Sequence, residues 1–397
     1  MTPTINIGLV GYGFMGKAHS NAYRQAEPFF QPALKPVMKV ICGRDEAAVK
    51  ETAENLGWEE YETSWEKLIA RPDIEIIDIS SPGDTHREIA VAAAEAGKHI
   101  LCEKPLANTL AEAEEMLAAV EKAGVKHLVN FNYRWVPAVR LAKKLIDEGA
   151  LGRVRHWRAT YLQDWLVDPE FPLEWRLRRE RAGSGALGDI AAHIVDLAHF
   201  LVGEISEVVG MTETFVKERP LPDARGKRGA VTVDDAAAFL ARFENGVFGT
   251  FEATRFATGR RNYQHFEVNG SRGSLAFNFE RMNELEFFSL DDPDYAQGFR
   301  TILVTEDVHD YVSAWWPPGH GLGYEHTFVH AVVDFLNAIG RDEMPQPSFV
   351  DGVRCQAVLE AVSASMETRR WVAVKKQKWT YEQSPETPID LGPYSVV

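Results

Sequence analysis

Cysteine is scarce in this sequence, with only Cys42, Cys102 and Cys355 in a chain of 397 residues. The three form no CxxC pair and no spacing typical of a zinc finger. A disulfide framework is therefore not expected, and a reducing, cytoplasmic setting is predicted.

Long apolar runs are also missing. No stretch of about 18 apolar residues occurs, so no transmembrane helix is predicted. The N-terminus, MTPTINIGLVGYG, lacks a basic region followed by a long apolar stretch, so no signal peptide is expected. A membrane is therefore not an expected partner.

Basic residues are fewer than acidic residues. The 43 Lys and Arg residues face 58 Asp and Glu residues, which gives a formal net charge of −15. This balance argues against nucleic acid as the main partner. Hydrophobic residues make up 45% and charged residues 25%, which is an ordinary globular composition, and the length predicts two or three domains.

Residues 1–132 alternate short apolar strands with helical segments. Strands are expected at residues 5–10, 37–42, 74–82, 99–105 and 126–132, each followed by a helix or a loop. This alternation predicts an α/β Rossmann domain, with a parallel sheet covered by helices on both faces.

The pattern changes after residue 132. A helix at 137–149, a strand near 152–163 and a helix at 185–203 are followed by strands without intervening helices. The Asn-Gly turns in ENGV and NGSRGS predict hairpins. We therefore expect an α+β domain over residues 133–397, with a large, mainly antiparallel open sheet. Two closing helices, near 324–339 and 352–369, are placed to pack back toward the first domain.

A glycine-rich motif follows the first strand and opens a helix. It reads Gly11-Tyr12-Gly13-Phe14-Met15-Gly16. Gly11 allows a tight turn, Gly13 lets the backbone approach a pyrophosphate, and Gly16 lets helix and strand pack closely. This context favours dinucleotide binding over a glycine-rich turn without a ligand.

The end of the second strand bears on the choice between NAD and NADP. An acidic residue there binds the ribose 2′-hydroxyl of NAD and repels a 2′-phosphate. Here Gly43 occupies that position, Arg44 follows and Asp45 comes after. Arg44 is able to pair with a 2′-phosphate or to stack on adenine, and Asp45 is able to reach the ribose. NAD is expected, with NADP left open.

Two further motifs carry titratable groups. Glu103-Lys104-Pro105 follows the fourth strand, at the edge where α/β folds bind ligands. Asp189 and His193 are four residues apart on one face of an otherwise apolar helix. Taken alone, the Asp-His pair is more typical of a satisfied core, so its meaning depends on the other motifs.

Five segments in order resemble the Gfo/Idh/MocA oxidoreductase family: GLVGYGFMGKAH, SSPGDTH, GKHILCEKPLA, NFNYR and GSGALGDIAAHIVDLAHFLVG. Two further runs, at 161–176 and 315–328, resemble the family's sugar dehydrogenases, those for anhydrosugars such as levoglucosan included. The resemblance implies a nicotinamide cofactor and a sugar or cyclitol between two domains. It also implies a homodimer or homotetramer formed through the open sheet face.

The resemblance assigns a catalytic trio to Lys104, Asp189 and His193. His193 is then the general base, Lys104 holds and polarises the reacting hydroxyl, and Asp189 orients the sugar. The Lys104–Pro105 peptide is expected to be cis. Expected cofactor contacts are Gly11, Gly13, Phe14, Met15, Gly16, Gly43, Arg44, Ser81, Pro82, Asp84, His86, Glu103, Lys104 and Asn132.

A second group of residues is expected at the substrate. Beside the trio, it comprises Tyr133, Trp165, Trp175, Arg176 and His320. Tryptophan faces stack on the apolar face of a pyranose, although ordinary packing at a domain interface explains them equally well. His326 and His330 are also four apart, but no third ligand has suitable spacing, so no metal site is predicted.

Three functions follow from these features. The first is an NAD(P)-dependent dehydrogenase that oxidises a secondary hydroxyl of a pyranose or anhydrosugar to a ketone. The second is an NAD-dependent glycosidase that works by transient oxidation and elimination, on sulfonated or other modified glycosides among others. The third is a non-catalytic NAD(P)-binding regulator, against which the intact trio argues.

Overall fold

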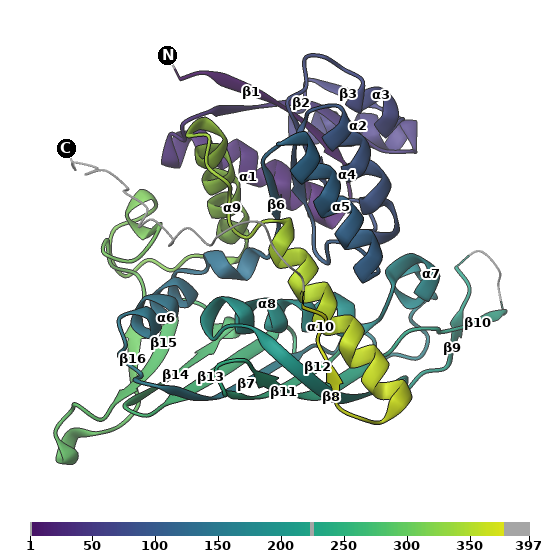
Figure 1. The fold of residues 1–397 in the computed structure, drawn as a ribbon. Coiled ribbons are helices and arrows are strands. Elements are labelled where there is room, and N and C mark those ends of the chain that lie inside the picture. The colour runs from purple at the N-terminus through teal and green to yellow at the C-terminus, as the bar shows by residue number, and fades with distance from the viewer. Residues whose placement is uncertain (1, 223–225, 377–397) are drawn as a thin grey trace.

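The computed structural model describes residues 2–222 and 226–376. Figure 1 shows two stacked parts, with a helix-covered sheet from the N-terminal half above a large, open sheet from the C-terminal half. The predicted fold class, a Rossmann domain followed by an α+β domain, is confirmed. No helix within the described ranges combines the length and apolar character needed to cross a membrane.

The N-terminal sheet has six strands, all paired in parallel, in the order β3-β2-β1-β4-β5-β6. Their bounds are β1 Thr4–Val10, β2 Lys35–Cys42, β3 Glu60–Glu62, β4 Ile76–Ile79, β5 His99–Cys102 and β6 His127–Val129. The helices are α1 Phe14–Phe30, α2 Glu46–Leu56, α3 Trp65–Ile69, α4 His86–Glu95 and α5 Leu110–Ala123. The sequence analysis found five of these strands and missed the short, exposed β3.

The strand order of the N-terminal sheet indicates where a ligand crevice lies. The chain runs outward from β1 to β3 on one side and from β4 to β6 on the other, so the order reverses between β1 and β4. In open α/β sheets, ligands bind outside the carboxyl ends of the strands at this point. Gly11 directly follows β1, and Lys104 lies two residues beyond the end of β5.

The C-terminal sheet has nine strands in the order β16-β15-β14-β13-β7-β12-β11-β8-β17. Their bounds are β7 Val154–Leu162, β8 Ile205–Glu213, β11 Ala236–Phe243, β12 Phe248–Thr254, β13 Tyr263–Gly270, β14 Gly273–Asn278, β15 Glu284–Ser289, β16 Arg300–Leu303 and β17 Val372–Ala373. The predicted hairpins β11–β12 and β13–β14 are present. The pair β7–β12 is parallel, and the chain between them includes α8 and the strands β8 to β11, long enough for the crossover that a parallel pair needs. A separate short pair joins β9 Glu218–Pro220 and β10 Arg228–Ala230.

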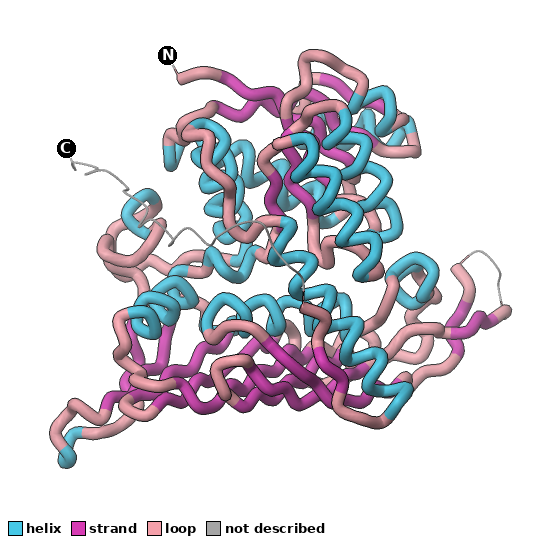
Figure 2. The backbone as a smooth tube through the Cα atoms, viewed as in Figure 1, coloured by secondary structure: helices cyan, strands magenta, loops and turns pink. Residues whose placement is uncertain are grey.

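Helices cover one face of the large sheet and leave the other uncovered (Figure 2). They are α6 Pro137–Asp147, α8 Ala192–Leu201 and α10 Phe349–Thr368, with the short α7 Arg179–Ala182 at one side and α9 Tyr324–Gly340 higher up. Helix α9 packs against α1, and α10 contacts both α5 and β8 (Figure 1). The closing helices therefore contact both parts of the molecule.

Candidate active site

The glycine-rich turn between β1 and α1 has the conformation its sequence predicts. Gly11 has a φ of +105°, and a Cβ there would lie 2.8 Å from the backbone of Ser80. A Cβ at Gly16 would collide with the carbonyl oxygen of Gly11, while Gly13 has nothing within 4 Å of that position. The turn is therefore tight at Gly11 and Gly16 and open at Gly13.

This opening fits a dinucleotide pyrophosphate. Gly13 is the N-cap of α1 and offers no side chain to the first-turn N–H groups, which include those of Phe14 and Met15. The first turn carries no acidic residue. Free N–H donors and the positive end of the helix dipole together favour an anion at this place. The residues present therefore fit NAD, with the pyrophosphate at the α1 N-terminus.

The ribose end of the predicted cofactor site lacks an acidic side chain at the usual position. The ring of Tyr12 lies over Gly43, where a Cβ would collide with it. Asp45 caps α2, with its carboxylate accepting the N–H of Ala48 at 3.0 Å. Arg44 is exposed. Position 43, where a carboxylate would favour NAD, is thus a glycine covered by the ring of Tyr12.

The segment after β4 is held by side chains rather than left open. His86 is buried, with Nε2 2.9 Å from the Ser81 carbonyl and Nδ1 3.1 Å from the Pro105 carbonyl. Asp84 forms an ion pair with Arg181 of α7, at 2.6 Å. His86 therefore joins the Ser81–Pro82 turn to the loop that carries Lys104. The Lys104–Pro105 peptide is cis, as predicted.

Lys104 reaches across to the helical segment that carries Asp189. Its Nζ donates to the backbone carbonyl of Asp189 at 2.7 Å and lies 3.4 Å from Oδ1. The predicted continuous helix begins instead as a π-helix over Leu187–Ala191 and becomes α8 at Ala192. Such π-turns occur frequently at functional sites. Here the π-turn contains Asp189, the residue predicted to be catalytic.

Asp189 lies among positive charges. Besides Lys104, the fully buried Arg255 places Nη1 3.6 Å from Asp189 Oδ2. Burial alone would raise the pKa of Asp189, but Lys104, Arg255 and Arg176 outweigh it and hold that pKa below its usual range. Asp189 is therefore a carboxylate at neutral pH.

His193 is buried one turn further along, against aromatic rings. Its ring centroid is 4.5 Å from that of Tyr133 and 5.9 Å from that of Tyr161. Burial, and secondly the charge of Lys104, lower its pKa well below the usual value, so the imidazole is neutral. Its buried Nδ1 has no hydrogen-bond partner among the described residues. A neutral imidazole is able to accept a proton.

Tyr133 is held in a chain of hydrogen bonds. Its hydroxyl lies 2.7 Å from that of Tyr161, which donates to Asn262 at 2.7 Å. Gln163 donates to the same Asn262 oxygen and accepts from Trp165 Nε1, both at 3.0 Å. Burial raises the pKa of Tyr133 to about 12, so it stays protonated and is a poor base.

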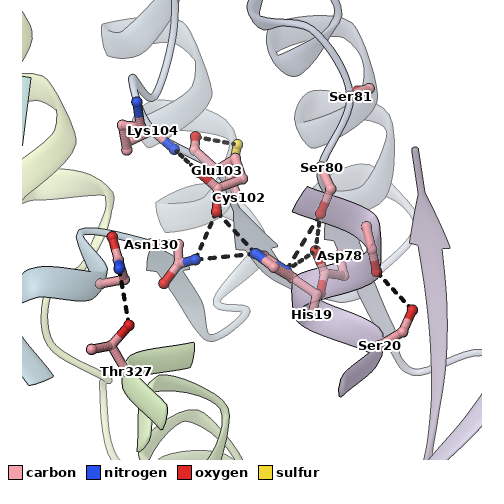
Figure 3. A network of polar contacts seen from close by, with 12 residues as sticks. His19, Ser20, Asp78, Ser80, Ser81, Cys102, Glu103, Lys104, Asn130 and Thr327 are labelled. Carbon is pink, nitrogen blue, oxygen red and sulfur yellow. Dashed lines mark hydrogen bonds and ion pairs between the residues drawn. The ribbon is translucent and has the colours of Figure 1, made fainter. Parts of the chain in front are cut away.

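The remaining predicted residues lie in different surroundings. The Arg176 guanidinium stacks on Trp175 at 4.4 Å, and its charge acts on Asp189. Asn132 donates to Thr327 of α9 at 3.0 Å. Glu103 points into a buried network with His19 (Figure 3). His320 is exposed, with Nδ1 2.8 Å from the Pro317 carbonyl. The structure thus brings Lys104 and Asp189 into contact, with the charge of Arg176 acting on Asp189, and the roles of all the predicted residues stay predictions.

The second histidine pair has structural partners. His330 accepts from Trp315 Nε1 at 2.8 Å, and its Nδ1 lies 3.0 Å from the Trp135 carbonyl. His326 Nδ1 accepts the N–H of Gly323 at 2.9 Å. No group of three or more metal-ligating side chains occurs in the part of the chain that the structure describes.

Three residues of this site were not predicted from the sequence. Arg255 directly follows β12, and Tyr161 lies near the end of β7, so both come from strands distant in sequence. Nothing local marks either residue, since their roles depend on sheet pairing. His19 did carry a signal, because a histidine on the helix after a glycine-rich turn is titratable and on the buried face.

Two family models match this chain. Residues 5–131 match the oxidoreductase family with an NAD-binding Rossmann fold, and residues 139–276 match the GFO/IDH/MocA C-terminal domain. Together they cover more than half of the sequence and correspond to the two parts of the structure.

Individual relatives match nearly end to end. The levoglucosan dehydrogenase of Pseudarthrobacter phenanthrenivorans is 46% identical, over 93% of this chain and 98% of that protein. A solved structure of levoglucosan dehydrogenase in complex with NADH and levoglucosan has a TM-score of 0.91 and 46% identity, covering 94% of this chain and 99% of that one. An oxidoreductase domain protein from Kribbella flavida has a TM-score of 0.92 and 57% identity, covering 94% and 100%.

Proposed function

Because this chain belongs to the Gfo/Idh/MocA family of oxidoreductases, we propose that it is an NAD-dependent sugar dehydrogenase. Its reaction is the oxidation of a secondary hydroxyl of a pyranose or an anhydrosugar, of which levoglucosan is the first candidate. The observation that carries this proposal is the contact of Lys104 with Asp189 in a chain similar along its whole length to levoglucosan dehydrogenase. That likeness favours the dehydrogenase over the glycosidase.

NAD fits the glycine-rich turn, and when bound it supplies the acceptor for the hydride that leaves the oxidised carbon. We assign the pyrophosphate to the α1 N-terminus at Gly13, Phe14 and Met15. The lack of an acid at Gly43 does not prevent NAD binding, since Asp45 and the backbone remain at that end of β2.

The protein's own groups then handle the proton. His193 is neutral and takes the hydroxyl proton as the general base. Lys104 donates a hydrogen bond to the reacting oxygen and stabilises its developing negative charge. Asp189 holds the ammonium of Lys104 and accepts from a neighbouring sugar hydroxyl. His193 is buried and Lys104 and Asp189 are partly buried, at 15% and 28% side-chain exposure, so fewer water molecules compete for these interactions than at the surface.

The sugar rests, in this proposal, against the aromatic and amide groups beside Tyr133. Trp165 lies over Arg255 at 5.6 Å from ring centroid to guanidinium carbon and is only partly buried. An indole face of this kind suits the apolar face of a pyranose. Trp175, with Arg176 stacked on it, forms the adjoining wall.

We further propose that the chain divides near residue 132 into a cofactor domain and a substrate domain, and that copies associate through the uncovered sheet face. This face carries exposed apolar side chains on three strands, among them Met211, Leu240 and Phe248. Light scattering should give a dimer or tetramer, and L240E should shift it toward monomer. A cytoplasmic location belongs to the same proposal.

A sugar screen tests the function. The purified protein is mixed with NAD or NADP and with levoglucosan, inositols, glucose or aryl glycosides, while reduced cofactor and aglycone release are followed together. We expect NADH to accumulate with levoglucosan or a close relative. Aglycone release without net NADH would contradict the proposal, and so would the absence of turnover by a protein that binds NAD.

A further inference from the structure

His19 of α1 lies between two buried carboxylates. Its Nδ1 is 2.9 and 2.8 Å from the two oxygens of Asp78 in β4, and its Nε2 is 2.9 Å from Glu103 Oε1 (Figure 3). The side chains of all three residues are at most 6% exposed. Tyr23 and Ser80 donate to Asp78 from its other sides, at 2.8 and 3.1 Å.

The two carboxylates favour a doubly protonated His19, with Asn130 Nδ2, 3.1 Å from His19 Nε2, donating to the same Glu103 oxygen. A neutral imidazole has a single N–H, so its second nitrogen would face a carboxylate with a lone pair. An imidazolium donates from both nitrogens and supplies the charge that two buried carboxylates require. In agreement, burial lowers the pKa of His19, but Asp78 and Glu103 outweigh it and raise that pKa to about 10.

The network continues to the Lys104 turn. Glu103 Oε1 also accepts from Asn130 at 2.7 Å, and Oε2 accepts the backbone N–H of Lys104 at 3.1 Å. Both oxygens of Glu103 are therefore fixed, one by His19 and Asn130, the other by the residue that reaches Asp189. Through His19, the helix with the open glycine turn is connected to the backbone of Lys104.

We propose that His19 is a positioning residue for Lys104, fixing Glu103 and, through it, the turn from which the ammonium reaches Asp189. This inference rests on the proposed role of Lys104 in hydride transfer. His19 touches neither the sugar nor the reacting atoms. Its loss should therefore slow the chemical step more than it weakens NAD binding. If His19 only joined α1 to the sheet, its loss would lower the stability of the protein and leave the rate unchanged.

The test compares H19Q with W58F. In H19Q the side chain has one donor group and one acceptor, so it does not satisfy two carboxylates. W58F removes the buried hydrogen bond that Trp58 Nε1 donates to Ser20 Oγ at 2.9 Å. Ser20 lies on α1, one residue from His19. The Ser20 hydroxyl bonds with the Gly16 carbonyl and Trp58 rather than with Glu103 or Lys104, so W58F is a matched loss of a buried hydrogen bond.

The measurements are the single-turnover rate of NADH formation with ordinary and deuterated sugar, the NAD dissociation constant and the melting temperature. The sugar is the one that wild type oxidises in the screen. For H19Q we expect at least a tenfold slower hydride transfer, an NAD dissociation constant within about threefold of wild type, and an increased isotope effect on kcat. For W58F we expect a lower melting temperature and a rate within twofold of wild type.

Two results would overturn the inference. One is an H19Q rate within twofold of wild type, and the other is an equal loss of rate in W58F. Should H19Q not fold, the H19Q/D78N double variant replaces it, because removing one carboxylate restores the charge balance. The same slowing is expected there, and a wild-type rate would count against the inference. Absence of turnover by wild type itself would instead contradict the proposed function.

Discussion

Replacing His193 by alanine separates catalysis from cofactor binding. General-base catalysis typically contributes 10²–10⁴ in rate, which corresponds to about 2.7–5.4 kcal/mol at roughly 1.36 kcal/mol per factor of ten. His193 is 6% exposed, and its ring packs against Tyr133 and Tyr161 rather than against the glycine-rich turn. We therefore expect kcat of H193A to fall by about 10²–10⁴, with NAD affinity within about twofold of wild type.

The pH profile adds an independent check on the same residue. Burial and the Lys104 charge lower the pKa of His193 well below 6.5, so the base is available at neutral pH and is lost only as pH falls through that lowered value. Wild-type kcat/KM should thus keep its plateau to below pH 6.5, the ordinary pKa of histidine, and H193A should lack this acidic limb. The K104A and H193A losses should not add in the double variant, since both groups act on one oxygen. An H193A enzyme with most of its kcat and an unchanged profile would refute the assignment.

Three further substitutions test separate parts of the account. G16A places a Cβ against the Gly11 carbonyl, so NAD affinity measured by calorimetry should fall at least tenfold, and unchanged affinity would count against the turn. R44A should keep NAD affinity within twofold while the weaker NADP affinity drops by about 1.5 kcal/mol, the scale of a charge-assisted hydrogen bond, because Arg44 is the exposed cation at the end of β2. D196A removes one partner of the buried Arg134, which is held at 2.6 and 2.9 Å, and chemical denaturation should show a loss of about 3 kcal/mol. A D196A loss below about 1 kcal/mol would show that the pair is not buried as described.

The layered fold could be predicted because its signals are local. Short apolar strands such as residues 5–10 and 37–42 are separated by segments whose apolar residues recur with helical periodicity. This alternation of strand and helix predicts a parallel sheet. The hairpins at Asn245-Gly246 and Asn269-Gly270 were marked by their turn residues. The strand β3 was not predicted, because it has only three residues and two of them are exposed.

Long-range features were beyond the sequence pattern. The parallel pair β7–β12 depends on how the whole sheet assembles. The π-turn at Asp189 leaves no periodicity signal, since its five residues fit a regular helix equally well. Arg255 reaches Asp189 only because β12 ends beside this turn.

The electrostatic state of the site was also invisible in the sequence. His193 was expected as the general base, and burial, which the sequence did not indicate for its imidazole, lowers its pKa well below 6.5. The side-chain oxygens of Glu103, a predicted cofactor contact, accept from His19, Asn130 and the Lys104 backbone, and its contact with the cofactor stays a prediction. Such states depend on which charges the fold buries together, and Glu103 is 84 residues from His19 and 27 from Asn130 in the sequence.

The most direct test of the central claim follows the hydride itself. Levoglucosan deuterated at every carbon is mixed with NAD and an excess of the wild-type protein, and the reduced cofactor and sugar product are analysed by mass spectrometry after one turnover. The account predicts one deuterium in each NADH formed, an equal amount of ketone, and no such transfer above background in a K104A/H193A double variant. Unlabelled NADH, or a sugar product without a ketone, would contradict it.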